Sequence, residues 1–165
     1  MEIVWAPWRM QYIEVADKPK GCIFCVLPAE NEDEKNLILY RGKNAFVMLN
    51  TFPYNPGHMM IIPFKHTADM QCLSDEELLE INHLIRYCIK LLKESVAPHG
   101  FNLGVNLGKS AGAGVAEHIH WHIVPRWEGD SNFMPVLANT KVMPESLQAT
   151  YKKFKEKLKE LGEPE

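Results

Sequence analysis

The sequence lacks an excess of positive charge, with 18 Lys and Arg against 21 Asp and Glu and a formal net charge of −3. Such a chain has little general attraction for DNA, RNA or anionic lipid. It also lacks an apolar run of the roughly 18 residues that a membrane-spanning helix requires, and its N-terminus carries tryptophan, proline and arginine where a signal peptide would be apolar. We therefore expect a cytoplasmic protein that binds neither nucleic acid nor membrane and holds any anionic ligand locally.

The sequence has only four cysteines, and they are not spaced like a disulfide framework. Cys22 and Cys25 form a C-x-x-C pair, which in a cytosolic chain indicates metal binding or redox chemistry. A thioredoxin-like pair would lie at the start of a helix within a βαβ pattern, and no such pattern is visible, which favours metal over redox chemistry. Cys72 and Cys88 fall near or inside a helical pattern, and we expect both to be small buried apolar groups.

Internal repeats and low-complexity segments are absent as well. A chain of 165 residues, 46% of them hydrophobic, is long enough for one well-packed core and too short for two comfortable domains. We therefore expect a single domain over residues 1–165. Apolar runs bounded by proline and glycine predict three strands before the histidine-rich segment, at residues 45–50, 58–63 and 101–106.

Helical spacing of apolar residues predicts a long helix at residues 74–96, opened by a capping box of Ser74 and Glu77. A second amphipathic pattern predicts a C-terminal helix at about residues 144–161, with proline in its first turn. The strands follow one another without regular helical crossovers. This order indicates an α+β fold in which helices cover one face of an antiparallel sheet.

The most informative segment, residues 117–126, reads E-H-I-H-W-H-I-V-P-R. On a strand that ends at Pro125, His118, His120 and His122 share one face while the apolar residues between them enter a core. Imidazole can act near neutral pH as a nucleophile, acid, base or metal ligand. The residues leave two chemical interpretations open, a three-histidine metal site and a nucleophilic histidine with two helpers, beside a histidine-rich surface strand without chemistry.

A glycine-rich segment, N-L-G-K-S-A-G-A-G at residues 106–114, stands directly before the histidine segment. Small residues let backbone amides approach a ligand closely, and consecutive N–H groups in such a turn make a concave anion site. A flexible hairpin connection would look the same. Because the loop must fold near the strand that follows it, it can hold phosphate oxygens beside the imidazoles.

Three motifs together resemble the histidine triad (HIT) family of nucleotide-binding proteins: N-P-G-H at residues 55–58, the loop at 106–114, and E-H-I-H-W-H-I-V-P-R-W at 117–127. The flanking W-A-P-W-R and P-R-W-E-G-D-S-N-F segments are most similar to the bacterial diadenosine tetraphosphate phosphorylase branch. The resemblance implies a HIT-like antiparallel sheet, adenosine nucleotides or dinucleoside polyphosphates as ligands, and a homodimer in which the sheets of two chains join.

The resemblance also implies roles for the histidines. His120 would attack the α-phosphorus of a nucleotide and form a nucleotidyl-histidine, which a neutral imidazole can do when a neighbouring carbonyl or carboxylate holds its other nitrogen protonated. His122 would contact the phosphate or the leaving-group oxygen, and His58 would support the site without acting as the nucleophile. The residues present demand no catalytic magnesium.

Nucleotide-binding residues follow from the same resemblance. Asn50 matches the family's ribose-binding position, although a residue at the end of a strand can equally serve a turn. Phe46 and Leu49 could flank the base, but core packing explains both equally well. Charge on the reacting phosphoryl group would be met by residues of the glycine-rich loop, namely Asn106, Gly112, Ala113 and Gly114.

A zinc ligand set that some bacterial family members carry matches Cys22, Cys25, His66 and His118. Two thiolates and two imidazoles satisfy tetrahedral Zn²⁺, and four protein ligands leave no open position for substrate. The implied zinc is therefore structural. It would tie an N-terminal segment, about residues 1–35, to the sheet and fix the strand that presents the nucleophile.

The loop departs from the hydrolase branch of the family, which usually carries a glutamine shortly before the first triad histidine. Here Gly112, Ala113 and Gly114 occupy that region, and their smaller side chains leave room for inorganic phosphate to accept the nucleotidyl group. We therefore expect phosphorolysis of diadenosine tetraphosphate to ADP and ATP. The alternatives are hydrolysis of dinucleotides or nucleoside phosphoramidates through the same intermediate, and a nucleotide-binding module without turnover.

Overall fold

The structure is a computed structural model that describes residues 21–130 and 143–164. The W-A-P-W-R motif and the first 20 residues of the predicted metal-linked segment lie outside the described residues. Two short 3-10 helices occupy Met70–Cys72 and Lys109–Ala111. The other elements, in chain order, are α2 (Ile23–Ala29), β1 (Ile38–Arg41), β2 (Ala45–Leu49), β3 (Met59–Pro63), α3 (Asp75–Val96), β4 (Gly100–Val105), β5 (Trp121–Arg126) and α5 (Leu147–Leu161).

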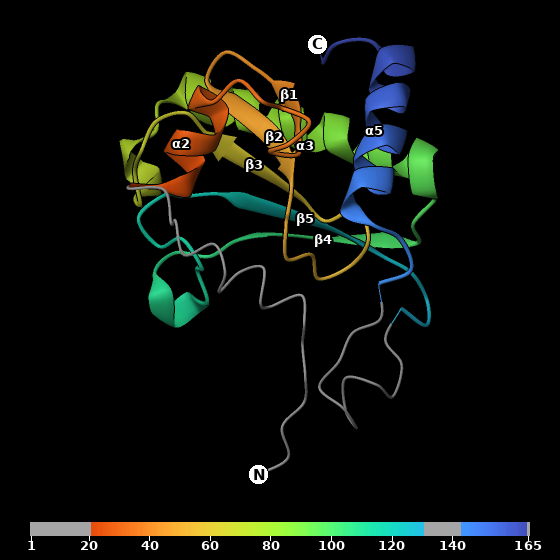
Figure 1. The fold of residues 1–165 in the computed structure, drawn as a ribbon. Coiled ribbons are helices and arrows are strands. Elements are labelled where there is room, and N and C mark those ends of the chain that lie inside the picture. The colour runs from red at the N-terminus through yellow and green to blue at the C-terminus, as the bar shows by residue number, and fades with distance from the viewer. Residues whose placement is uncertain (1–20, 131–142, 165) are drawn as a thin grey trace.

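The five strands form one antiparallel sheet in the order β1-β2-β3-β5-β4 (Figure 1). The predicted hairpin is confirmed, because β2 and β3 pair from Ala45 opposite Pro63 to Leu49 opposite Met59. β5 lies between β3 and β4, and among the described residues β1 and β4 are the edges of the sheet. The α+β fold predicted from the sequence is confirmed by this sheet and by the helices that pack on it.

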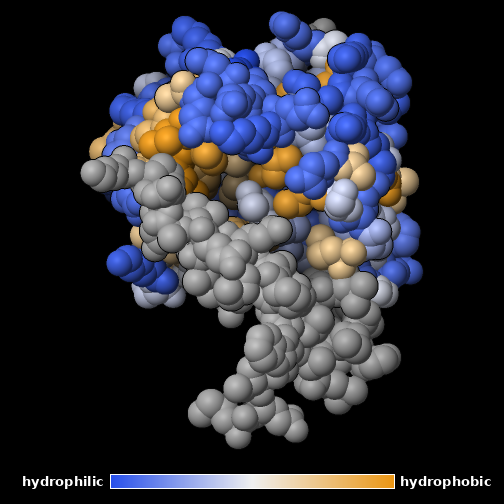
Figure 2. All heavy atoms as spheres, viewed as in Figure 1, coloured by the Kyte–Doolittle hydropathy of each residue, from blue (hydrophilic) through white to orange (hydrophobic). Residues whose placement is uncertain are grey.

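Alternation along the strands divides the core between the two faces of the sheet. On one face, Val47 and Leu49 belong to a large cluster that includes residues of α3 and α5. On the other face, Phe46 and Met48 form a smaller cluster with Phe24 of α2. Apolar residues gather around α2 in the view of Figure 2. The prediction that helices cover one face only is therefore wrong, because α2 packs on the second face.

Both long helices begin at a serine. The Ser74 hydroxyl accepts a hydrogen bond from the Glu77 N–H, and the Glu77 carboxylate accepts one from the Ser74 N–H, so the predicted capping box is confirmed. α5 begins at Leu147 instead of about residue 144, because Ser146 caps it by accepting a hydrogen bond from the Ala149 N–H. Within the described ranges, no helix is both long and apolar enough to cross a membrane.

The sequence patterns miss two short elements, α2 and β1. α2 has seven residues and contains Pro28, and β1 has four, so neither offers enough positions for a periodic pattern. Cys22 is the N-cap of α2, so the C-x-x-C pair does lie at a helix start, although the strand pairs of the described chain are all antiparallel. Cys88 is buried as predicted. Cys72 is exposed, contrary to prediction, because it lies in a surface 3-10 helix before α3.

The histidine segment is only partly a strand. β5 begins at Trp121, so His118 and His120 precede it. β5 also continues through Pro125, and the predicted end of the strand at this proline is wrong. The proline is tolerated because β3 pairs with β5 only as far as Ile123, so its missing N–H removes no bond from the β3 ladder.

Candidate functional site

The three histidines of the repeat separate into two groups. The ring centroids of His120 and His122 lie 4.8 Å apart, and His58, from the loop before β3, places its ring 5.1 Å from that of His122. His118 instead directs Nδ1 toward Cys22 and Cys25. The apolar residues of the segment pack in the large cluster that includes residues of α3 and α5, as the alternation predicts: Ile119, Trp121 and Ile123. One group is therefore suited to proton and phosphoryl chemistry and the other to metal binding.

A backbone carbonyl determines the proton position of His120. Its Nδ1 lies 2.9 Å from the His118 carbonyl oxygen, and because a carbonyl only accepts hydrogen bonds, Nδ1 carries the proton. Nε2 then keeps its lone pair. His120 is 4% exposed, and burial lowers its pKa, so the ring is neutral near pH 7. Such an imidazole can attack an electrophile without first losing a proton.

A chain of hydrogen bonds orders the protons of His58 and His122. The Tyr54 backbone N–H donates to Nδ1 of His58 over 3.1 Å, so the neutral His58 ring carries its proton on Nε2. This Nε2 lies 2.9 Å from Nδ1 of His122 and donates to it, which leaves the His122 proton on Nε2. Burial, together with neighbouring imidazoles, lowers the pKa of His58 to about 3 and that of His122 to about 4. His122 therefore offers an N–H donor on a ring whose centroid lies 4.8 Å from that of His120.

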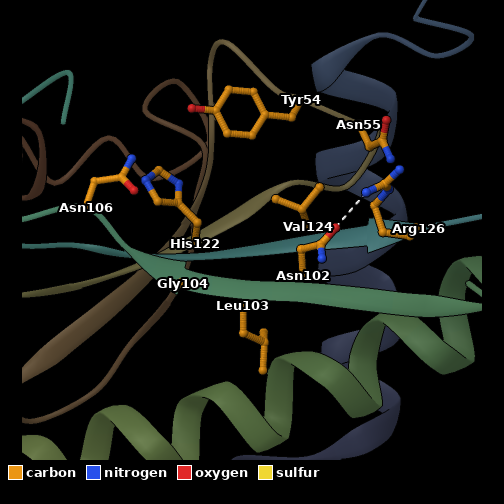
Figure 3. A pocket seen from close by; sticks show the side chains of 9 residues that line it. All are labelled: Tyr54, Asn55, Asn102, Leu103, Gly104, Asn106, His122, Val124 and Arg126. Carbon is orange, nitrogen blue, oxygen red and sulfur yellow. Dashed lines mark hydrogen bonds between the residues drawn. The ribbon is translucent and has the colours of Figure 1, made fainter. Parts of the chain in front are cut away.

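A pocket of about 350 Å³ opens beside His122 (Figure 3). The Tyr54 ring stacks on that of His122, with centroids 6.1 Å apart and planes inclined by 29°. At the other end of the pocket, Arg126 of β5 donates a hydrogen bond to Asn102 of β4. A ligand in this pocket would lie against the histidine that offers the N–H donor.

The four predicted metal ligands, Cys22, Cys25, His66 and His118, converge so that their ligand atoms lie within 4.8 Å of one another. Three sulfur–nitrogen distances are 3.3, 3.5 and 3.6 Å, and the two Nδ1 atoms are 3.2 Å apart. A tetrahedron with typical Zn–S and Zn–N bonds has edges of about 3.5 and 3.3 Å. Nε2 of His118 donates to the Pro63 carbonyl, which leaves Nδ1 as a lone-pair donor. The donor set therefore fits a tetrahedral zinc ion.

The HIT domain model matches residues 31–129 of this chain. The chain belongs to the HIT family. It is 38% identical over 157 residues to AP-4-A phosphorylase from Mycobacterium tuberculosis, covering 91% of this chain and 80% of that protein. It is 28% identical over 139 residues to adenosine 5′-monophosphoramidase from Schizosaccharomyces pombe, covering 84% of this chain and 99% of the relative. The crystal structure of a Zn-bound histidine triad protein from Mycobacterium smegmatis aligns with a TM-score of 0.69 at 25% identity, covering 86% and 95% of the two chains.

Phe24 contacts a histidine of each group. It does not belong to the three motifs on which the resemblance to the HIT family rests, so those motifs do not point to it. It lies between the two cysteines, is 3% exposed, and packs on both His118 and His120, with ring centroids 5.6 and 4.9 Å away. The only sequence signal was an aromatic residue inside the C-x-x-C segment, which does not reveal a contact with a distant segment. Phe24 forms a wall beside His120, and its position depends on how α2 is held.

The predicted nucleotide-binding residues on and after β2 separate into one polar and two core positions. Nδ2 of Asn50 lies 3.4 Å from Nδ1 of His58, while its Oδ1 accepts a hydrogen bond from the Phe52 N–H. Asn50 thus closes a turn, as the alternative interpretation holds, and at the same time lies beside His58. Phe46 and Leu49 are 0% and 1% exposed and lie on opposite faces of the sheet. Core packing accounts for both of these residues.

The HIT loop before the histidine segment brings one side chain to the site. Asn106 lines the pocket together with His122. Gly112 ends the 3-10 helix with a φ of +89°, a conformation that favours glycine. The N–H groups of Gly112 and Ala113 donate to carbonyls of the same loop, whereas that of Gly114 makes no hydrogen bond within the described residues. Of the three predicted loop amides, Gly114 is therefore the one that a ligand can reach without breaking the turn.

Proposed function

We propose that this HIT protein is a nucleotidyl-transferring enzyme that splits diadenosine tetraphosphate by phosphorolysis to ADP and ATP. The observation that carries the proposal is the hydrogen bond from His120 Nδ1 to the His118 carbonyl, which leaves Nε2 as a buried and neutral nucleophile. The similarity to a protein named AP-4-A phosphorylase, 38% identical over most of the chain, supports this choice of substrate.

In the first step, Nε2 of His120 attacks the α-phosphorus, a P–N bond forms, and the bond from that phosphorus to the bridging oxygen breaks. The Nε2–H of His122 donates a hydrogen bond to the departing oxygen, on which negative charge develops. His58 keeps His122 in this tautomer through the 2.9 Å hydrogen bond between their rings. ATP leaves with the bridging oxygen, and an adenylyl group remains on His120.

In the second step, an oxygen of inorganic phosphate attacks the same phosphorus, the P–N bond breaks, and ADP is released. His120 thereby recovers its lone pair. Asn50 is proposed to bind the ribose, and the phosphates are proposed to contact Asn106, Gly112, Ala113 and Gly114. The small side chains of the loop favour phosphate as the acceptor because they leave space for a group larger than water.

Incubation with diadenosine tetraphosphate, with and without phosphate, tests the reaction. Phosphate-dependent formation of ADP and ATP supports the proposal. Formation of AMP and ATP without phosphate would mean that water is the acceptor, and phosphorolysis would be wrong.

His120→Ala tests the nucleophile. We expect it to lose turnover and covalent labelling by substrate labelled at the α-phosphorus, while AMP still binds. His83→Ala, which changes a histidine of α3 outside both groups, is the matched control and should retain both. Unchanged turnover in His120→Ala would remove this residue from the nucleophilic role.

We also propose that Cys22, Cys25, His66 and His118 hold a structural zinc ion. A bound ion would fix α2 against the histidine segment. The tetrahedral spacing of the donor atoms and the Zn-bound HIT neighbour support this proposal. Metal analysis of Cys22→Ser should show loss of zinc, whereas Cys72→Ser, which changes an exposed cysteine outside the set, should retain it. Stoichiometric zinc in Cys22→Ser would argue against this ligand set.

We further propose a homodimer in which the sheets of two chains join. β4 supports this arrangement because it is an edge of the sheet within the described chain, and its Leu103 is 51% exposed. Sedimentation equilibrium should give twice the mass of one chain. A single-chain mass across the micromolar range would overturn the dimer.

A further inference from the structure

The pocket in Figure 3 extends along β5 from His122 to Arg126, and His120 precedes the start of β5. His122, Val124 and Arg126 alternate along the strand and line the same side, so Arg126 lies about 13 Å beyond His122. On the neighbouring β4, Gly104 stands opposite His122 and Asn102 stands opposite Val124. The pocket is therefore a groove across two strands, with His122 at one end and the Arg126 guanidinium at the other.

The position of the pocket determines which part of a dinucleotide can reach it. Asn50, the proposed ribose contact, follows β2, whereas the pocket lies over β5 and β4. In the sheet, β3 separates β2 from these two strands. A substrate held at Asn50, with its α-phosphorus at His120, must extend its other half over β5 and β4. The leaving oxygen must also depart in line with the attacking nitrogen, and along the chain His122 stands between His120 and the pocket.

The pocket lining suits a nucleoside that carries phosphate. Tyr54 is 56% exposed, and its hydroxyl makes no hydrogen bond within the described residues, so its ring and its oxygen are both available to a ligand. Arg126 donates three of its five N–H groups to Asp130 and Asn102. The volume of about 350 Å³ is near the lower end for ligand pockets, which suits one nucleoside and excludes a whole dinucleotide.

We propose that Tyr54, Asn102 and Arg126 form the binding site for the leaving nucleotide of a dinucleoside polyphosphate. The phosphates next to the broken bond lie beside His122, and the nucleoside beyond them contacts Tyr54, Asn102 and Arg126 through its base and sugar. The proposal rests on the proposed function, because it takes His120 as the nucleophile. If the proposal holds, contacts in this pocket determine how strongly the enzyme prefers a dinucleotide over a nucleotide whose leaving group is small.

Two substrates separate binding of the leaving nucleotide from the chemistry at His120. Diadenosine tetraphosphate releases ATP, whereas adenosine 5′-phosphoramidate releases only ammonia. We expect Tyr54→Ala and Asn102→Ala each to lower the ratio of kcat/KM for the first substrate to that for the second by about tenfold. Effects on the shared chemistry of His120 cancel in this ratio. His83→Ala, which changes a residue of α3 outside the pocket, is the control and should leave the ratio within about twofold of the wild type. Tyr54→Phe keeps the aromatic ring and should lower the ratio less than Tyr54→Ala does.

An unchanged ratio in both alanine variants overturns the proposal. A raised KM for inorganic phosphate with an unchanged ratio would assign the pocket to the acceptor, and the proposal would again be wrong. If the wild-type protein consumes the phosphoramidate but not the dinucleotide, both the proposed function and this inference are wrong. An unchanged ratio in a protein that does consume the dinucleotide overturns only the inference, so the two failures can be distinguished. Because Asn102 is exposed, Asn102→Ala keeps the test decisive even if Tyr54→Ala unfolds.

Discussion

The burial of His58 makes the stability of the protein depend on pH. This imidazole is 1% exposed, and its pKa is lowered to about 3, chiefly by burial. A histidine in the unfolded chain has a pKa of about 6.5. Between these two values the unfolded chain binds a proton that the folded protein excludes, so the free energy of unfolding falls as the pH falls. The stability contributed by His58 is complete above pH 6.5 and is lost progressively toward pH 3.

The size of the effect follows from linkage. Each pH unit below 6.5 lowers the free energy of unfolding by about 1.4 kcal/mol for one such group, which amounts to about 2 kcal/mol between pH 7 and pH 5. Urea unfolding followed by tryptophan fluorescence at these two pH values measures it. The wild type should lose about 2 kcal/mol more than His58→Gln, whose amide can donate to His122 without titrating. Both proteins keep the same zinc ligands, so the pH dependence of the metal site cancels.

Equal losses of stability in the two proteins would refute this reasoning. They would mean that the folded protein accepts a proton at His58 as readily as the unfolded chain does. The hydrogen bonds that order the protons of His58 and His122 would then not survive mild acid.

Three other changes test the packing around the site. Ser74→Ala removes the helix cap and should lower the free energy of unfolding by about 1 kcal/mol in urea titrations, and no change would contradict the capping role. Gly57→Ala should cost about 1–3 kcal/mol, because φ is +80° and a Cβ would lie 3.1 Å from the Phe154 ring; a neutral effect would show that the ring yields. Phe24→Leu should keep its zinc by metal analysis but slow covalent labelling of His120 by about tenfold, and equal labelling rates would exclude Phe24 as a positioning residue.

The sequence predicts best those elements whose signals are local. The capping box at Ser74 joins residues three positions apart, and the hairpin of β2 and β3 follows from two apolar runs with a proline- and glycine-rich loop between them. Two predictions failed because the local sequence signal was missing or misleading: α2 was missed, and the start of α5 was placed too early. α2 is too short for a periodic pattern, and proline at residue 144 suggests a helix start that Ser146 supplies instead.

Which residues belong to each of the two histidine groups depends on contacts between segments that are far apart in the sequence. Cys22 and Cys25 indicate metal from their own spacing, but His66 and His118 joined the set only through the family resemblance. The structure brings all four together because α2 packs on the second face of the sheet. No local pattern predicts that placement, or the contact of Phe24 with the ring of His120.

The sequence by itself determined that three imidazoles alternate with residues that enter a core, because side chains on successive residues of an extended segment point to opposite faces, although only His122 of the three lies in β5 itself. Only the tertiary structure decided where their protons lie. His120 is oriented by a carbonyl, His58 by the Tyr54 N–H, and His122 by a ring 64 positions away in the chain. The physical reason is that a tautomer depends on which donor or acceptor each nitrogen meets, and folding alone brings those partners within hydrogen-bond distance.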